Sequence, residues 1–440
     1  MKVGFISLGC PKNQVDSEMM IEKLAAAGFE ISDDLGEVDI VVINTCAFIE
    51  DAKKEAIENI LDMVSMKEDG LIKKIIVTGC LAQRYKDDIL QEIPEVDAVV
   101  GLGANGDIAE ILTAVTAGEE HKTSYPDVSL MPLGDPRILT TPQHWAYLKI
   151  ADGCSNRCTY CSIPSIRGDF RSRPMEGIIE EARQLVTGGV KEIILVAQDT
   201  TRYGEDIYGE KKLPQLLREL NTIDGLRHIR ILYCYPDRIT PQLLDAMAEC
   251  DKVVNYIDLP LQHCNGEILK SMNRHGDKES LLQLISDIRT KLPDATLRTT
   301  LIVGFPGETE EQFNELCQFV KEARFDRLGC FTYSPEEGTD AAGMPNQIDE
   351  DEKVRRGEII MDIQQKIFEE KLSENVGKII DVTVDGYDAY TDCYYGRAAS
   401  DAPDIDSIVT MTCSYELFEG DLVQVEIFEV MNGDLIGEVV

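Results

Sequence analysis

Six of the thirteen cysteines in this chain stand in two sets of three whose spacing could support metal chemistry. One set forms a CxxxCxxC motif and consists of Cys154, Cys158 and Cys161. The other set is dispersed, each member just after a short apolar run, and consists of Cys10, Cys46 and Cys80. Three thiolates can hold three irons of a 4Fe–4S cluster and leave the fourth iron open for a ligand that the protein does not supply. The sequence therefore predicts two 4Fe–4S clusters with separate tasks.

A structural zinc loop is the alternative for the CxxxCxxC motif. Zinc takes four ligands, usually in paired cysteine motifs or with histidines at fixed spacing. No cysteine or histidine follows Cys161 within forty residues, the next being His228 and Cys234, and this favours the cluster. The other cysteines show no ligand spacing, and we expect buried free thiols at Cys234, Cys250, Cys264, Cys317, Cys330, Cys393 and Cys413.

The dispersed cysteines belong to a region, residues 1–135, in which short strands and helices alternate. Strands are expected at 3–8, 39–44, 74–78 and 97–100, and helices at 17–27, 50–66, 82–93 and 107–117, with Asp16 and Ser17 as caps of the first helix. This order predicts a parallel-sheet α/β domain. Each dispersed cysteine follows the carboxyl end of one strand, and those ends meet at one edge of a parallel sheet. We therefore expect the three thiols to converge.

A glycine motif in the same region could suggest a dinucleotide site. Residues 101–106 match GxGxxG between a strand and a helix. The motif follows the fourth strand instead of the first, and no strand with an acidic end comes next. We interpret these glycines as turn residues. A proline-bearing linker is expected at about 118–143.

A second series of strands and helices spans residues 140–370 and contains the CxxxCxxC motif. Its expected strands lie at 145–150, 192–197, 228–233, 255–259, 297–303 and 327–333, and a long helix at 350–375 closes it. Six βα units predict an open relative of the βα barrel, in which chemistry gathers at the carboxyl ends of the strands. Candidate cofactor contacts there are Tyr160, Gln198 and Gly304, although a tight turn explains Gly304 equally well. His263 is either a proton carrier or a satisfied polar residue.

The tail, residues 373–440, has a different pattern. Strands at 378–384, 393–398, 421–429 and 435–440 predict a small antiparallel barrel. From 371 to 440, three lysine and arginine residues stand against fifteen aspartate and glutamate residues. A barrel that grips RNA would be basic. Carboxylates such as Asp401, Asp404 and Asp406 would form either a merely solvated loop or a surface that attracts a cationic partner.

The overall composition supports an α/β multidomain protein. At 440 residues the chain suits two or three domains, and its net charge of −37 argues against a nucleic-acid surface. No apolar stretch approaches membrane-spanning length, and the start does not read as a signal peptide. The thirteen cysteines then indicate a reducing, cytoplasmic compartment.

The whole arrangement resembles the radical S-adenosylmethionine methylthiotransferases, in the branch that modifies an aspartate of a small-subunit ribosomal protein. The motifs that carry the likeness are Ser7-Leu-Gly-Cys10-Pro-Lys-Asn13, Asp16-Ser-Glu18, Gly153-Cys154, Tyr256-Ile-Asp-Leu-Pro-Leu-Gln-His263 and Gly304-Phe-Pro-Gly-Glu-Thr309. The transfer-RNA branch typically reads Gly-Cys-Gln-Met-Asn at the first cysteine. The glycine-glycine-glutamate motif of many superfamily members is absent, and Ala197-Gln198-Asp199 stands in its place.

The resemblance implies specific roles. The CxxxCxxC cluster would cleave S-adenosylmethionine to a 5′-deoxyadenosyl radical, and the dispersed cysteines would hold an auxiliary cluster that carries the sulfur. The substrate would be a basic ribosomal protein, which suits the acidic charge, and a flavodoxin or ferredoxin would donate electrons. Two alternatives stay open: methylthiolation of an adenosine in transfer RNA, and a non-catalytic iron–sulfur scaffold or redox sensor.

Overall fold

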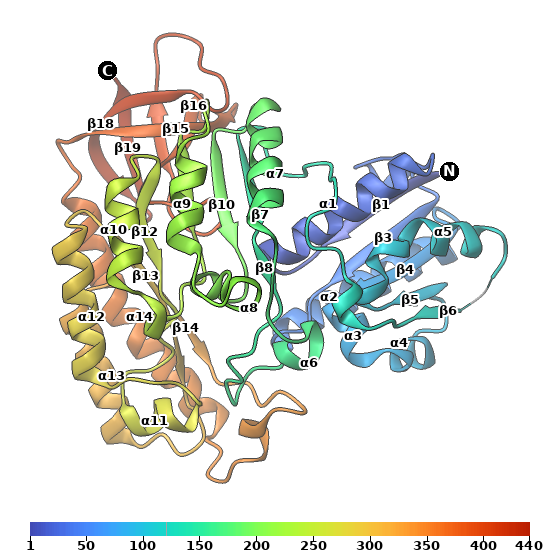
Figure 1. Cartoon of the computed structure of the whole chain (residues 1–440), viewed down its shortest axis with the longest axis horizontal. Helices are drawn as coiled ribbons and strands as arrows, with labels where there is room; N and C mark the ends of the chain where they lie inside the picture. The colour runs from blue at the N-terminus through green and yellow to red at the C-terminus, as the bar shows by residue number, and fades with distance from the viewer. Residues whose placement is uncertain (120) are drawn as a thin grey trace.

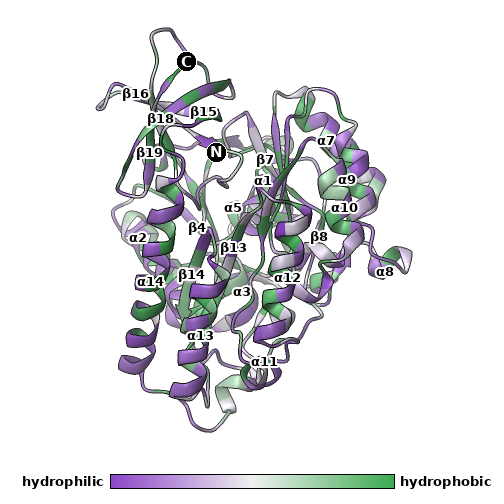
Figure 2. Cartoon of the chain, turned by 90° about the vertical axis from the view of Figure 1, so that its left-hand side faces the viewer, coloured by the Kyte–Doolittle hydropathy of each residue, from purple (hydrophilic) through white to green (hydrophobic). Residues whose placement is uncertain are grey.

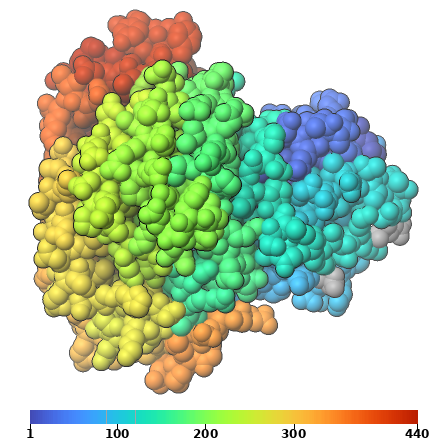
Figure 3. Space-filling model, viewed as in Figure 1, coloured from blue at the N-terminus to red at the C-terminus, as the bar shows by residue number. Residues whose placement is uncertain are grey.

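The computed structural model describes residues 1–119 and 121–440. Figure 1 shows three units: an amino-terminal domain, a central domain built on a second sheet, and a small barrel near the carboxyl terminus. In Figure 3 the amino-terminal domain forms a lobe against one side of the central domain. The expected α/β multidomain fold is confirmed. One residue of the expected linker, Glu120, lies outside the described residues.

The amino-terminal domain is an all-parallel six-stranded sheet in the order β2-β1-β3-β4-β5-β6. Its strands are β1 (Lys2–Ser7), β2 (Glu30–Ile31), β3 (Ile40–Thr45), β4 (Lys74–Gly79), β5 (Ala98–Val100) and β6 (Lys122–Ser124). Its helices are α1 (Pro11–Ala26), α2 (Glu50–Glu68), α3 (Cys80–Tyr85), α4 (Asp87–Glu92) and α5 (Ile108–Thr116). Helices cover both faces, so the central strand β3 is buried at every position. The edge strands β2 and β6 were not predicted, because they are short and carry few apolar residues.

The predicted start of the first helix is wrong. Helix α1 begins at Pro11, with Cys10 as its N-cap residue. Proline suits the first turn of a helix because its missing N–H has no intrahelical partner there. Asp16 and Ser17 therefore lie inside the helix, and both are buried. Their side chains bond to other elements and are not free to cap.

The central domain is an open parallel sheet in the order β14-β13-β12-β11-β10-β7. Its strands are β7 (Trp145–Lys149), β10 (Glu192–Val196), β11 (His228–Ile231), β12 (Val253–Asp258), β13 (Thr296–Val303) and β14 (Arg327–Thr332). The covering helices are α7 (Met175–Thr187), α9 (Leu213–Asn221), α10 (Pro241–Glu249), α12 (Lys278–Lys291), α13 (Glu310–Ala323) and α14 (Glu350–Ser373). Figure 2 shows hydrophilic residues on the outer sides of α13 and α14.

A short segment between β7 and α7 carries the CxxxCxxC loop. It contains the two-stranded sheet of β8 (Ala151–Asp152) and β9 (Arg171–Ser172), with helix α6 (Ile163–Arg167) between them. Two further short helices of the domain are α8 (Glu205–Tyr208) and α11 (Gly266–Ser271).

The carboxy-terminal barrel closes in the order β15-β16-β17-β19-β18. Its strands are β15 (Ile379–Asp388), β16 (Cys393–Ala398), β17 (Val409–Thr412), β18 (Leu422–Met431) and β19 (Asp434–Val439). The prediction missed β17, and with it the one parallel pair that closes the barrel, β17 with β19. Burial alternates along β18 as one face turns inward.

Charged side chains fix the barrel to the central domain. Asp401 accepts from Arg327 at 2.5 Å, and Asp406 accepts from the Tyr256 hydroxyl at 2.6 Å. Both carboxylates are almost fully buried. The expectation that they are solvated or partner-attracting is therefore wrong for these two residues, and only Asp404 is exposed. Sequence shows the charge but not the arginine and tyrosine that meet it.

The seven cysteines outside the two sets differ in their burial. Cys234, Cys250, Cys264 and Cys317 are buried free thiols, as predicted. The prediction is wrong for three thiols that are partly exposed, Cys330, Cys393 and Cys413. In the described part of the chain, no helix is both long and apolar enough to cross a membrane.

Candidate functional site

Both cysteine sets line one cavity of about 470 Å³. The thiols of the amino-terminal domain, Cys10, Cys46 and Cys80, follow β1, β3 and β4, and those of the central domain follow β8. The carboxyl ends of both parallel sheets thus face the same space. The sequence predicted convergence within each set, but the shared cavity could not be predicted because it depends on how the two domains pack.

Glycines allow the dispersed cysteines to approach each other. Gly9 and Gly79 have φ of +93° and +94°, in the left-handed region that side chains disfavour. A Cβ on Gly9 would stand 2.9 Å from the Cys46 sulfur. A Cβ on Gly79 would stand 2.4 Å from the carbonyl oxygen of Thr45. The loops that carry the first set can therefore pack only with glycine before Cys10 and Cys80.

The CxxxCxxC loop is held by the backbone around it. The N–H of Cys154 donates to the carbonyl of Gly168 at 3.0 Å, and that of Thr159 donates to Met272 at 3.1 Å. Gly153, with φ of +77°, precedes the first cysteine, and a Cβ there would meet the Asp169 carbonyl oxygen at 2.2 Å. Clamping at both ends fixes the positions from which the three sulfurs project.

The described thiols do not form a ready-made site for one shared ion. Among residues 1–119 and 121–440, no three His, Cys, Asp or Glu side chains converge closely enough to hold a single metal ion. Zinc requires such convergence, whereas each thiolate of a 4Fe–4S cluster binds its own iron. Burial raises the pKa of the Cys80 and Cys161 thiols to about 12, so a bound metal must displace their protons.

A buried arginine stands beside each set of thiols. Arg167 lies close enough to Cys10 and Cys80 to interact electrostatically with both. Arg274 has a terminal nitrogen 3.9 Å from the Cys158 sulfur and stacks over the Tyr235 ring at 4.2 Å. Three thiolates around a cluster bring negative charge into a poorly solvated site, and a guanidinium offsets it. Both positions therefore fit an anionic cluster.

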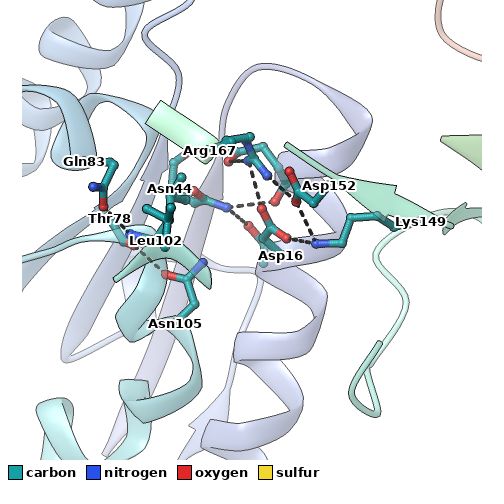
Figure 4. Close-up of polar contacts among 12 residues, drawn as sticks. Asp16, Asn44, Thr78, Gln83, Leu102, Asn105, Lys149, Asp152 and Arg167 are labelled. Atoms are coloured by element: carbon teal, nitrogen blue, oxygen red, sulfur yellow. Dashed lines mark hydrogen bonds and ion pairs between the residues drawn. The ribbon is translucent and has the colours of Figure 1, made fainter. Parts of the chain in front are cut away.

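Four buried charged side chains connect the loops that carry the two sets of cysteines (Figure 4). They are Asp16, Lys149, Asp152 and Arg167. Arg167 donates to Asp16 at 2.9 Å and to Asp152 at 2.8 Å. Lys149 bonds to the same two carboxylates. All four side chains are at most 1% exposed. Burial opposes the charge of Asp152, but Arg167 and Lys149 outweigh burial and lower its pKa. The quartet couples α1, whose N-cap residue is Cys10, to the loop that holds Cys154.

Three family models together match most of this chain. They are uncharacterized protein family UPF0004 at residues 2–101, the radical SAM superfamily at 148–320 and the TRAM domain at 376–440. The chain is 49% identical to the ribosomal protein uS12 methylthiotransferase RimO of Lachnoclostridium phytofermentans, with 99% of each chain covered. It is 47% identical to that of Clostridioides difficile, with 100% of this chain and 99% of the relative covered. The chain belongs to the RimO family.

Solved structures support the fold of this RimO family member. The radical S-adenosylmethionine methyltransferase TsrM of Kitasatospora setae superposes with a TM-score of 0.57 at 14% identity, over 75% of this chain and 72% of that one. The cobalamin-dependent enzyme OxsB superposes with a TM-score of 0.53 at 14% identity, over 82% and 56%. Members of the RimO family use S-adenosylmethionine and two 4Fe–4S clusters, as the cysteine sets predicted.

Two amide oxygens that line the cavity have no hydrogen-bond partner among the described residues. Gln198 donates its Nε2 to Asp152 at 2.8 Å, and Asn156 donates its Nδ2 to Asp199 at 2.9 Å. The side-chain oxygens of both amides are buried without a hydrogen bond. A buried acceptor of this kind calls for a donor that enters the site. The ammonium group of S-adenosylmethionine is such a donor, so the residues present fit the cofactor.

Of the other residues predicted to act in the site, Tyr160 lies at the cavity, whereas Gly304 and His263 are not among its lining residues. Tyr160 lines the cavity, and burial raises the pKa of its hydroxyl. Gly304 is not among the cavity-lining residues, and a Cβ there would meet Lys353 at 2.3 Å. Its φ of +73° and this close approach explain the glycine by packing. His263 is fully buried beside Glu308, with its Nδ1 accepting from the Asn265 N–H at 2.9 Å.

Proposed function

We propose that this chain attaches a methylthio group to the β-carbon of an aspartate in ribosomal protein uS12. The observation that carries the proposal is the shared cavity, because both cysteine sets line one chamber. Sulfur held at one set can thus reach a carbon activated at the other. The near-full-length identity to uS12 methylthiotransferases supports the substrate.

We infer the roles of the six cysteines from their two loops. One cluster would be held by Cys154, Cys158 and Cys161, and the other by Cys10, Cys46 and Cys80. When bound at the first cluster, S-adenosylmethionine would supply the methyl group and the radical that abstracts a hydrogen atom from carbon. The second cluster would supply the sulfur. Hydrogen removed as an atom needs no general base at the carbon.

The protein's own part is to bind, orient and exclude water. Gln198, fixed by Asp152, and Asn156, fixed by Asp199, would accept from the ammonium of S-adenosylmethionine. Tyr160 would pack against the same cofactor from the CxxxCxxC loop. Cavity walls of apolar side chains keep water from the reacting carbon.

The wider setting follows from charge. A net charge of −37 favours a basic ribosomal protein over transfer RNA. A flavodoxin or ferredoxin in the cytoplasm would supply electrons to the clusters. A passive scaffold or redox sensor would need neither the shared chamber nor the unpartnered amide oxygens.

Mass spectrometry tests the substrate directly. Cells with and without the enzyme would be compared for methylthio groups on uS12 and on transfer RNA. We expect the modification on uS12 only, and loss of it in a variant with Cys10, Cys46 and Cys80 replaced by alanine. Modified transfer RNA together with unmodified uS12 would overturn the proposal.

A further inference from the structure

Lys12 is a buried cation whose charge the site already described does not use. It is the second residue of α1, two positions after Cys10, and its side chain is 6% exposed. It lines the shared cavity together with both sets of thiols. The ammonium group lies 3.3 Å from the centre of the Tyr233 ring, which follows β11 of the central domain. Lys12 thus bridges the two walls of the chamber.

Lys12 differs in its partners from Arg167 and Arg298, two of the other cations that line the cavity. Arg167 pairs with Asp16 and Asp152, and Arg298 donates to Asp258 at 3.1 Å. Within the described ranges, the Lys12 ammonium forms no hydrogen bond or ion pair with a carboxylate. The Lys12 ammonium interacts electrostatically with Cys10 and Tyr233. Without a carboxylate partner, these contacts compensate for only part of the cost of burying its charge.

The ligand that Lys12 lacks is an anion that enters the chamber. The start of α1 adds to the attraction, because the amino end of a helix favours negative charge. Cys10 caps this helix without a side-chain hydrogen bond to its first turn. Asp258, a carboxylate that lines the same cavity, already accepts from Arg298 and from the Tyr233 N–H.

We propose that Lys12 binds the side-chain carboxylate of the substrate aspartate. This inference rests on the proposed function, because it names the group that recognises the residue to be modified. A carboxylate on Lys12 would lie in the chamber that both thiol sets share, and the β-carbon is bonded directly to the carboxylate carbon. Lys12 would then select aspartate over its uncharged analogue asparagine and aim the β-carbon.

A binding cycle tests the proposal without relying on turnover. The loaded enzyme and its Lys12→Met variant would each be titrated with a uS12 peptide that carries the target aspartate, and with the same peptide carrying asparagine. Methionine keeps the length of the lysine stem without its charge. We expect the native enzyme to bind the aspartate peptide at least about tenfold more tightly, because losing one partner of a buried charge pair is costly. The variant should bind both peptides alike.

Controls distinguish a role of Lys12 in binding the substrate from a role in stabilising a cluster. Lys54→Met removes an exposed lysine and should leave the preference unchanged. Iron content, the electron paramagnetic resonance signal of both clusters and S-adenosylmethionine binding should be the same in Lys12→Met as in the native enzyme. A variant that keeps the preference, or that weakens both peptides equally while altering a cluster, would overturn the inference.

The native enzyme alone also decides the question if the variant fails to fold. A native enzyme that modifies uS12 but binds both peptides equally would refute Lys12 recognition and leave the proposed function standing. A native enzyme that leaves uS12 unmodified would refute the proposed function itself.

Discussion

At the scale of the residue, the chemistry depends on the glycines and arginines that lie beside the cysteine thiols. Gly9 and Gly79 let Cys10, Cys46 and Cys80 approach each other, and Arg167 and Arg274 lie where they would balance the charge of bound clusters. The cysteine spacing predicted from sequence that the six thiols would gather, since a short motif and three strand ends suffice, and the structure places all six around one cavity. Their role as cluster ligands stays a prediction. The arginines were not predictable, because they come from separate elements and carry no motif of their own.

The two clusters should be separable by substitution. Replacing Cys154, Cys158 and Cys161 by alanine should remove about half of the iron and all cleavage of S-adenosylmethionine, because the other ligands belong to a different domain. Replacing Cys10, Cys46 and Cys80 should remove methylthio transfer but leave cleavage. Iron assays and chromatography of 5′-deoxyadenosine measure both. Cleavage that survives in the first variant would disprove the assignment.

Gln198 should affect the binding of S-adenosylmethionine more than the clusters. We expect Gln198→Ala to weaken cofactor binding by about ten- to hundredfold, as the loss of one hydrogen bond to a charged group costs about 1.5–3 kcal/mol. Isothermal titration of the loaded enzyme measures this. Gln184→Ala on the exposed face of α7 is the matched control. Unchanged affinity would show that Gln198 only orients Asp152.

At the scale of the element, patterns that repeat were predictable and contacts between distant elements were not. Buried parallel strands read as apolar runs, so most strands of both sheets were found. Strand β17 has only four residues and was missed. Asp16 was taken for a cap because its partners, Lys149 and Arg167, lie more than one hundred residues away. Only the packing of α1 on β7 and α6 shows its role.

The contact of β10 with the barrel should depend on pH. Glu192 accepts from Arg230 at 2.8 Å and from Arg397 of β16 at 3.0 Å. Burial opposes its charge, but the two arginines lower the pKa of Glu192 to about 2. A depressed pKa stabilises the fold above the unfolded value of about 4.3, and the stabilisation is lost as pH falls towards 2.

We therefore expect Glu192→Gln to lower the free energy of unfolding by about 3 kcal/mol at pH 7, since it leaves buried arginine charge uncompensated. Urea denaturation at a series of pH values measures the difference from the native chain. The difference should shrink below about pH 4.3. Glu249→Gln, at an exposed pair with Arg218, should change little. A difference that is constant with pH would contradict the account.

At the scale of the whole molecule, the charge of −37 should govern encounter with a basic substrate. Exposed carboxylates of the barrel include Glu416, Glu419, Glu426 and Glu429. Replacing these four by glutamine should slow association with uS12 and flatten its dependence on salt, because screening acts within about 8 Å at physiological ionic strength. Stopped-flow mixing measures the rates. Asp401 must be left intact, as it holds the barrel in place. Tighter binding of transfer RNA than of uS12 would contradict this reading.

All three structural units contribute residues to the cavity wall, so the cavity is complete only after the carboxy-terminal barrel has been synthesised. Phe48 comes from the amino-terminal domain, Phe331 from β14 and Ile405 from the barrel. A ribosome making this chain has released both sets of thiols long before Ile405 emerges. In the nascent protein, the side of the cavity that Ile405 later covers would therefore be open, and iron–sulfur delivery and oxygen would both reach the two sets of thiols from that side. Completion of the last domain puts the final wall on the chamber.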